Sequence, residues 1–326
     1  MKEVSFIRQN IEKWKSLERV VDDFETRNPS EIADAYTVIT SDLSFARSHY
    51  PQSRITIYLN NLALMLHNSL HKTKKEHFSR IKTFWTQEIP DAMYRSRKDL
   101  LYSFIVFIIS VLIGVISALN DDSFVRLILG DGYVDMTLAN IQDGDPMGVY
   151  KDMSPVPMFL RIAYNNIGVS FYIFVLGLLT GFGTGYGLFS NGVMIGAFQT
   201  FFFQQGADLG FESVLAVWCH GTFEISAIVI AGAAGFALGN GWFFPGTYPR
   251  LYAFKQGAMR GLKIIVGLIP VFLIAAFLES FITRHTEYPT AVRLSIIIVS
   301  FLCVVFYYLI LPYLRAKRKE KLITNH

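Results

Sequence analysis

Charged residues and cysteines are both scarce in this chain of 326 residues. Only 17% of the residues are charged, whereas 52% are hydrophobic. Because a soluble domain typically carries about 25% charged residues, this composition excludes an ordinary soluble globular protein. The two cysteines, Cys219 and Cys303, both lie in apolar stretches, so we predict no disulfide framework.

Long apolar runs are absent from the first 99 residues and frequent after them. A helix needs about 20 apolar residues to cross a hydrocarbon core of ~30 Å. Runs of this kind occupy residues 100–119, 167–188, 192–203, 213–239, 261–282 and 294–314. The third run is short, so five crossings, or a re-entrant hairpin of the second and third runs, are the alternatives to six. We predict an all-α, polytopic membrane protein with about six transmembrane helices over residues 100–314.

Basic residues cluster in three segments that the apolar runs separate. Residues 1–99 contain sixteen lysines and arginines, the connection 240–260 contains three, and the tail 315–326 contains five. Six crossings place these segments on one side of the membrane, which the positive-inside rule identifies as the cytoplasm. We therefore predict cytoplasmic N- and C-termini, with 315–326 as a basic cytoplasmic tail. Arg284 falls on the outer side, where Glu279 and Glu287 are its candidate partners.

Residues 1–99 are expected to form a separate cytoplasmic helical domain. Apolar residues recur at three- and four-residue steps, as at Ile11 and Trp14, which is typical of an amphipathic helix. Residues 28–31 have the Asn-Pro-x-Glu pattern of a helix start. Further apolar stripes follow, the last of which runs from Phe78 to Ile89. Four such helices would pack as a bundle, which could be purely structural or a docking domain.

Residues 120–160 form the predicted outer loop, which contains seven aspartates. Asp143-Gly144-Asp145 resembles part of a calcium loop, but the twelve-residue pattern with its closing glutamate is missing. We predict a partner-facing acidic surface or a short amphipathic segment at the membrane interface. Neither a metal ion nor another cofactor is predicted for the chain.

An ionisable pair interrupts the longest apolar run, residues 213–239. His220 and Glu224 are four residues apart, so they project from one face of a helix. A charged carboxylate at the bilayer centre costs roughly 2.5–3.5 kcal/mol on insertion scales, so Glu224 needs a partner, a proton or water. Its candidate hydrogen-bond partners on neighbouring helices are Asn165, Asn166, Asn191 and Gln199.

Three chemistries compete at this pair. A zinc protease would need a second helical histidine in the pattern H-E-x-x-H, and one histidine with one carboxylate makes a poor metal site. A proton relay for coupled transport and a polar cluster that fixes helix assembly both stay open. No nucleophile elbow, phosphate loop or catalytic carboxylate pair occurs elsewhere, so we predict that the chain is not an enzyme. The predicted intramembrane polar site comprises His220, Glu224, Asn165, Asn166 and Asn191.

Glycines concentrate in the apolar runs at spacings that let helix backbones approach closely. The alternative is that residues 181–187 unwind their helix and line a cavity, as broken helices do in transporters. The predicted packing positions are Gly181, Gly185, Gly192, Gly196, Gly232 and Gly235.

Several short patterns occur together in this chain. They are His220-Gly221-x-x-Glu224, Ala231-Gly232-Ala233-Ala234-Gly235, Asn165-Asn166, Asn191-Gly192-x-x-x-Gly196 and, in the N-terminal domain, Asp42-Leu43-Ser44-x-Ala46-Arg47. In these patterns the chain resembles the stage II sporulation protein M family of polytopic membrane proteins. The resemblance implies a multi-spanning protein of the bacterial inner membrane. In spore formers, such a protein works with a membrane-anchored cell-wall hydrolase and another membrane protein during engulfment.

The function predicted from these features is that of a scaffold or assembly subunit of an envelope complex. Its expected partners are membrane lipids, other membrane or envelope proteins and further copies of the chain in a homo-oligomer, but not nucleic acid. The rival prediction is a transporter or channel-like subunit that uses the His220/Glu224 pair.

Overall fold

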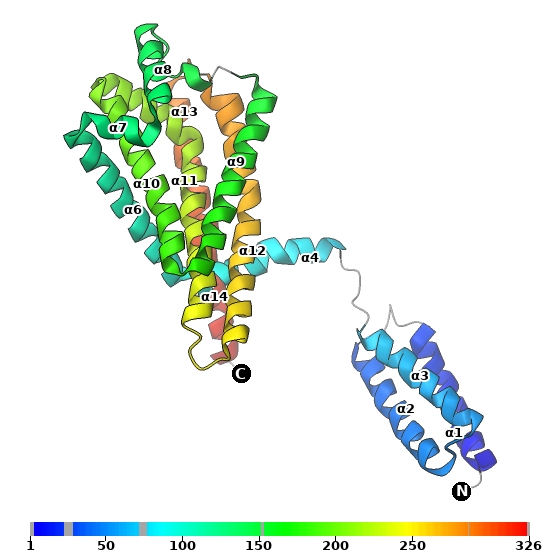
Figure 1. Ribbon diagram of the computed structural model, residues 1–326. Coiled ribbons are helices and arrows are strands. Elements are labelled where there is room, and N and C mark those ends of the chain that lie inside the picture. The colour runs from blue at the N-terminus through cyan, green and yellow to red at the C-terminus, as the bar shows by residue number, and fades with distance from the viewer. Residues whose placement is uncertain (1–2, 23–28, 72–76, 151–152, 286, 325–326) are drawn as a thin grey trace. The chain divides into compact units, whose positions relative to one another are not determined.

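Helices make up the regular secondary structure of the part of the chain that the computed structural model describes, residues 3–22, 29–71, 77–150, 153–285 and 287–324 (Figure 1). The predicted all-α fold is therefore confirmed. The chain divides into two compact units, Met1–Arg80 and Ile81–His326. Each unit has a hydrophobic core of its own.

Three amphipathic helices build the first unit. They are α1 (Glu3–Asp22), α2 (Pro29–His49) and α3 (Arg54–His71). Their apolar stripes meet in a core that includes the fully buried side chains of Trp14, Ile39, Leu59 and Leu66. The Trp14 Nε1–H donates a 2.7 Å hydrogen bond to Asp42 Oδ2, and Asp42 also forms a 2.6 Å ion pair with Lys13. The predicted helix start is found at Pro29, although its Asn28 lies outside the described residues.

The boundary between the units falls after Arg80 rather than after residue 99, so most of the fourth helix expected in this bundle belongs to the second unit. This segment consists of α4 (His77–Thr83), which the boundary divides, the π-helical turn η1 (Phe84–Glu88) and α5 (Ile89–Arg95). Ile89 and Met93 are buried in the core of the membrane helices, and Tyr307 donates a 2.7 Å hydrogen bond to the Trp85 carbonyl. An amphipathic pattern shows that a helix has an apolar face but cannot specify what covers it.

Among the described residues, five helical segments are long and apolar enough to cross a membrane. They are α6 (Arg97–Asn120), α9 (Pro155–Leu176) with η3 (Gly177–Leu179), α11 (Ala207–Phe243), α12 (Arg250–Phe277) with the π-helical η4 (Leu278–Thr283), and α13 (Thr290–Val305) with η5 (Phe306–Ile310) and α14 (Leu311–Thr324). A sixth helix, α10 (Gly181–Gln204), has 24 residues, as α6 does, and carries no charged residue. Its glycines and polar residues leave it without an 18-residue stretch as hydropathic as those of the other five. The bundle thus has five clearly apolar spans and a sixth helix of membrane-spanning length.

The break between α9 and α10 lies at Gly177–Thr180, inside the run 167–188 that was predicted to be one helix. Thr180 adopts a φ of +78°, and its hydroxyl oxygen accepts a 3.2 Å hydrogen bond from the Phe182 N–H. Because the turn comes early, the short third run becomes the second half of a full-length helix rather than part of a re-entrant hairpin. The alternative prediction, that residues 181–187 unwind, is wrong, because these residues are helical.

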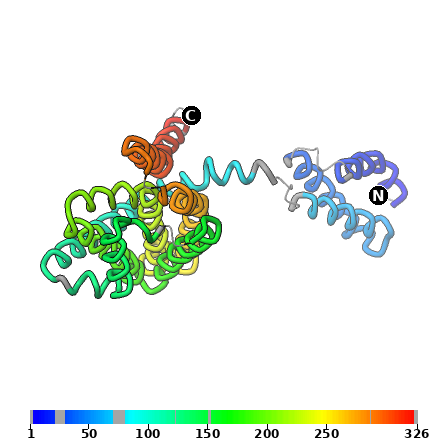
Figure 2. Tube along the Cα trace, turned by 90° about the horizontal axis from the view of Figure 1, so that it is seen from above, coloured from blue at the N-terminus to red at the C-terminus, as the bar shows by residue number. Residues whose placement is uncertain are grey.

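Successive membrane helices run in alternating directions, which sorts the connections to two ends of the bundle (Figure 1). One end carries α7 (Asp122–Leu129), α8 (Asp131–Gln142) and η2 (Gly148–Tyr150), so the predicted outer loop is largely helical. The opposite end carries Arg97, Arg250 and the C-terminal helix α14. The basic segments of this unit therefore share one end. In Figure 2, which looks along the bundle, α13 and α14 (orange to red) lie at its periphery.

The predicted basic tail, residues 315–326, is not a separate segment over its described part. It continues α14 as far as Thr324. Lys319 forms a 2.5 Å ion pair with Asp91 in α5, and Arg315 lies 3.7 Å from the same carboxylate. These pairs tie the C-terminal helix to the segment that precedes the first span.

Four of the six predicted packing glycines lie where another helix comes too close for a side chain. An added Cβ at Gly196 would lie 2.3 Å from the Val111 carbonyl oxygen of α6, and one at Gly235 would lie 2.4 Å from Thr184 Oγ1 of α10. Gly192 and Gly232 have comparable contacts, at 2.7 Å and 2.3 Å. Such separations are far shorter than van der Waals contact, so only glycine fits.

Gly181 and Gly185 do not belong to these close contacts. The nearest atom to an added Cβ at Gly181 is 3.5 Å away, and none lies within 4 Å at Gly185. Gly177, which was not among the predicted packing positions, makes one of the closest approaches, since an added Cβ there would lie 2.2 Å from the Gly235 carbonyl oxygen. Sequence spacing alone does not show which face of a glycine-rich helix meets a neighbour.

Candidate functional site

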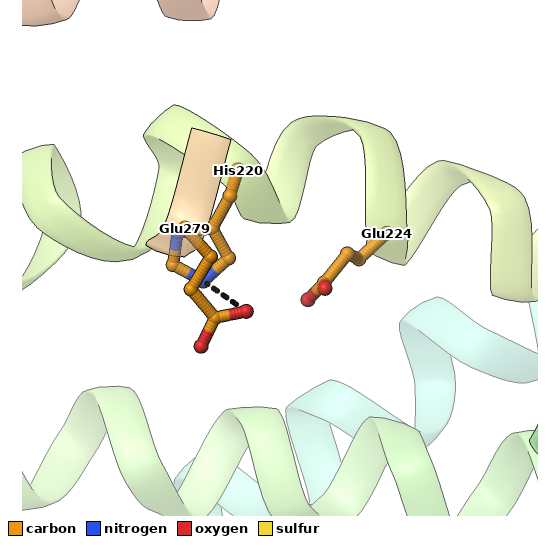
Figure 3. Close-up of side chains that lie close together, drawn as sticks. All are labelled: His220, Glu224 and Glu279. Atoms are coloured by element: carbon orange, nitrogen blue, oxygen red, sulfur yellow. Dashed lines mark ion pairs between the residues drawn. The ribbon is translucent and has the colours of Figure 1, made fainter. Parts of the chain in front are cut away.

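Three ionisable side chains converge inside the membrane unit. His220 and Glu224 lie one turn apart on α11, and Glu279 projects toward them from the π-helical η4 (Figure 3). Each offers one nitrogen or oxygen atom, and these three atoms lie within 4.8 Å of one another. The predicted pair is therefore part of a triad that also includes a residue not assigned to the site from sequence.

The imidazole of His220 is held between two groups of η4. Its Nδ1 lies 3.0 Å from the hydroxyl oxygen of Thr283, and its Nε2 lies 3.8 Å from Glu279 Oε2. The ring is buried, with only 4% of the residue exposed. Contact with Thr283 on one nitrogen fixes the ring plane and directs the other nitrogen toward the two carboxyl groups.

Glu224 lies between Asn166 and Glu279. The side-chain amide of Asn166, on α9, donates a hydrogen bond to Glu224 Oε1. One carboxyl oxygen of Glu279 lies within 4.8 Å of one of Glu224. Polar side chains of α9, α11 and η4 therefore meet at this point of the membrane unit.

The triad lies near the middle of the bundle. The hydroxyl of Ser103 donates a 2.6 Å hydrogen bond to the Val229 carbonyl, and Ser103 is six residues into α6. At ~1.5 Å per residue this contact is roughly 9 Å from the basic end of α6, and Glu224 is roughly 8 Å further along. Since α6 is about 36 Å long, Glu224 lies close to mid-height, where an isolated charge is costly.

Of the amides proposed as partners for Glu224, the structure brings only Asn166 to it. Asn165 is exposed and donates a 3.4 Å hydrogen bond to Asn166. Asn191 donates to the Gly187 carbonyl of its own helix at 2.8 Å. Gln199 donates to Ser213 Oγ at 2.6 Å, joining α10 to α11 at the outer end. Asn165 thus reaches the triad only through Asn166, and Asn191 belongs to a different part of the bundle.

Glu279 was missed because its position near the end of an apolar run suggested a role at the membrane surface. It was a candidate partner for Arg284, but it turns inward to His220, and Arg284 donates a 3.3 Å hydrogen bond to the Met153 carbonyl. The π-helical geometry of η4 changes which residues face the bundle. A sequence signal was nevertheless present, since Glu279 is the one acidic residue of the run 261–282.

An ion pair lies roughly two to three helical turns along α11 from the triad, toward its outer side. Arg293 of α13 contacts both carboxylate oxygens of Glu212, at 2.7 Å and 3.3 Å, and only 7% of Arg293 is exposed. The Cys219 thiol donates to the Arg293 carbonyl at 3.7 Å. This bidentate contact attaches the peripheral α13 to α11 and gives Arg293 a partner that sequence did not suggest.

The family model for stage II sporulation protein M matches residues 103–284, more than half of the chain. The chain belongs to the stage II sporulation protein M family. The matched region extends from α6 through η4, so it contains His220, Glu224 and Glu279. Membership and the five apolar spans together show a multi-pass membrane protein.

The first unit has a match of its own. Residues 4–72 match a domain of unknown function (DUF8413), and this range coincides with α1, α2 and α3. No curated protein and no solved structure matches the chain. The boundary between the two family matches agrees with the division into two compact units.

Proposed function

We propose that the protein is a scaffold or assembly subunit of an envelope complex in the bacterial inner membrane. The observation that carries the proposal is the combination of a tightly packed membrane bundle with a second compact unit, Met1–Arg80, that has a hydrophobic core of its own. A small helical domain attached to a membrane anchor can hold a partner beside the membrane. A catalytic role is not part of the proposal.

The packing of the membrane unit supports a static role. Backbone atoms of neighbouring helices meet at Gly196 and Gly257, where an added Cβ would lie within 2.5 Å of a carbonyl oxygen of another helix. Hydrogen bonds from Asn166 to Glu224 and between His220 and Thr283 link α11 to α9 and to η4. In the hydrocarbon core such contacts stabilise one arrangement of helices, because a displaced polar group finds no water there.

The same end of the bundle carries Arg97, Arg250 and the basic residues of α14. By the positive-inside rule we place this end in the cytoplasm and α7 and α8 on the outer side. The first unit precedes Arg97 in the chain and is therefore assigned to the cytoplasm. Partners on the two sides would then meet α1–α3 inside and the α7–α8 segment outside.

Photo-cross-linking in living cells tests the proposal. Ile57 and Leu64 are seven residues apart on α3, and they are 62% and 56% exposed, which is unusual for apolar side chains of a small bundle. A photoreactive phenylalanine analogue at either position of the full chain should give the same discrete protein adducts. Glu12, on an exposed position of α1, is the matched control and should give none. Absence of adducts at Ile57 and Leu64, or equal adducts at all three positions, would contradict a docking role.

A cation-transport subunit is the second candidate. It is favoured by one observation, the three ionisable groups within 4.8 Å of one another at mid-height of the bundle. It predicts cation uptake by proteoliposomes that contain the purified protein, with uptake lost in Glu224→Gln. The scaffold proposal predicts no uptake by either protein.

A further inference from the structure

The triad has the donor set of a metal site. His220 contributes an imidazole nitrogen, Glu224 and Glu279 contribute carboxylate oxygens, and the three atoms lie within 4.8 Å of one another (Figure 3). Glu279 stands on η4, and π-helical turns within helices are frequent at functional sites. We propose that His220 Nε2 and one oxygen each from Glu224 and Glu279 bind a divalent transition-metal ion of the zinc type.

The separations fit such an ion after small side-chain movements. Zinc–nitrogen and zinc–oxygen bonds of ~2.0–2.1 Å in tetrahedral geometry place ligand atoms roughly 3.3 Å apart. His220 Nε2 and Glu279 Oε2 are already 3.8 Å apart, and one oxygen of Glu224 completes a set of three ligand atoms within 4.8 Å of one another. The terminal torsions of glutamate side chains have broad minima, so the two carboxylates can rotate toward a shared ion.

The groups behind the ligands are those that metal sites require. Thr283 contacts Nδ1 of His220 at 3.0 Å, which leaves Nε2 to face the ion, and the Asn166 amide donates to Glu224 Oε1. A ligating histidine almost always has a hydrogen-bond partner on its other nitrogen, and ligating carboxylates are held in a similar way. Each ligand is thus oriented by a residue that does not itself bind the ion.

Charge balance also favours a divalent ion at this depth. A neutral imidazole and two ionised carboxylates carry a total charge of −2, so a divalent cation makes the site neutral. Without a cation, the two carboxylates could not both be ionised at this separation in the membrane interior. A neutral complex avoids most of the desolvation cost of separate charges.

The ligand types select among cations. Calcium and magnesium prefer six or more oxygen ligands, whereas an imidazole with two carboxylates suits zinc, manganese or iron. The one histidine and one carboxylate on α11 make a poor metal site by themselves, and Glu279 supplies a second carboxylate. The neighbouring thiol takes no part, because Cys219 Sγ contacts the Arg293 carbonyl.

Zinc binding to the full-length protein tests this proposal, whatever the outcome for the scaffold role. Protein purified in detergent, stripped with a chelator and titrated with Zn²⁺ against a chromophoric competitor should bind one ion per chain. Glu224→Gln and Glu279→Gln should each weaken binding by at least ~100-fold, and Thr283→Val, behind the histidine, by ~10–100-fold. The matched controls Asp208→Asn, exposed on α11, and His285→Gln, whose half-buried side chain lies beyond η4 and contacts Glu287, should bind as the wild type does.

X-ray absorption of the zinc-loaded wild type keeps the test independent of variant folding. The expected first shell contains one imidazole nitrogen and only oxygen besides. Absence of stoichiometric binding, a sulfur ligand, or unchanged affinity in both glutamate variants would overturn the proposal.

Discussion

Single residues at the centre of the bundle stabilise one another through complementary hydrogen bonds. Glu224 accepts a hydrogen bond from Asn166 and lies close to Glu279, while His220 contacts both Glu279 and Thr283. Each of these groups would be unfavourable alone in hydrocarbon, and removal of one leaves its neighbour without a partner. The effect of a substitution here therefore depends on the partner that stays behind.

Asn166→Leu removes the amide that donates to Glu224 and leaves a carboxyl oxygen unsatisfied. We expect it to destabilise the membrane unit by about 1 kcal/mol, the usual range for hydrogen bonds between membrane helices. The measurement is the midpoint of thermal unfolding in detergent. Asn165→Leu is the matched control, because Asn165 is exposed on the adjacent position of α9 and its substitution should leave the midpoint nearly unchanged. Equal midpoints for the two variants would speak against the hydrogen bond.

Tyr58, in the first unit, predicts a pH dependence outside the membrane. Burial, together with a hydrogen bond to Glu18, raises the pKa of Tyr58 from 10.0 to about 12. The folded unit thus favours the neutral phenol, so this contribution to stability is complete below pH 10 and is lost as the pH rises to about 12.

The measurement is the difference in tyrosinate absorbance between wild type and Tyr58→Phe during alkaline titration. The difference should appear near pH 12 and accompany loss of helical signal from the first unit. A difference centred near pH 10, with the helices intact, would contradict the burial of this phenol.

Whole helices in the membrane unit are positioned mainly by glycines. α6 and α10 touch through backbone at Gly114 and Gly196, and α11 and α12 do so at Gly241 and Gly257. These contacts bring carbonyl groups and Cα atoms of facing helices together, which maximises dispersion contacts where the hydrophobic effect is absent. The polar triad then adds its side-chain contacts between α9, α11 and η4.

Gly196→Ala should destabilise the bundle, because the new Cβ would lie 2.3 Å from the Val111 carbonyl oxygen and force α6 and α10 apart. We expect a loss of roughly 1–3 kcal/mol, as for other overpacked sites. Gly185→Ala is the matched control on the same helix, with no atom within 4 Å of the added methyl group. Thermal unfolding in detergent compares them, and a similar midpoint for both variants would contradict the α6–α10 contact.

At the scale of elements, sequence predicted the apolar spans well and their interruptions poorly. The run 167–188 contains no charged residue or proline, so nothing marked the turn at Gly177–Thr180, which depends on the positive φ of Thr180. His220 and Glu224 were recognisable because ionisable residues are rare in such runs. The sequence could not show that Glu279 and Thr283 lie beside them, because spacing within one helix does not indicate which helix lies opposite.

The whole molecule combines two units whose sequences differ in kind. Met1–Arg80 is a charged three-helix bundle, and Ile81–His326 is an apolar bundle with basic residues at one end. The boundary predicted from the first apolar run fell at residue 99, because hydropathy detects the start of a span and not the start of a packed unit. Residues 81–99 are amphipathic and pack on the membrane helices.

The orientation is checked by labelling single cysteines from each side of the membrane. In a Cys219→Ser/Cys303→Ser background, Lys317→Cys on α14 should react with an impermeant maleimide only after the cytoplasmic side is opened. Gly132→Cys on α8, where no atom lies within 4 Å of an added Cβ, should react in intact cells. The account places five crossings between these two positions, which puts them on opposite sides of the membrane. Labelling of both positions from the same side would contradict this topology.

In the proposed scaffold role, the membrane unit is a closed assembly element rather than a pathway for cations. The most direct test places Asn166→Cys in the same cysteine-free background and measures its reaction with a small, water-soluble, membrane-impermeant thiosulfonate from each side. We predict no reaction from either side, while Lys317→Cys and Gly132→Cys react fully on their own sides. Rapid reaction of Asn166→Cys from one side would reveal water reaching the triad, contradict the scaffold account and favour transport.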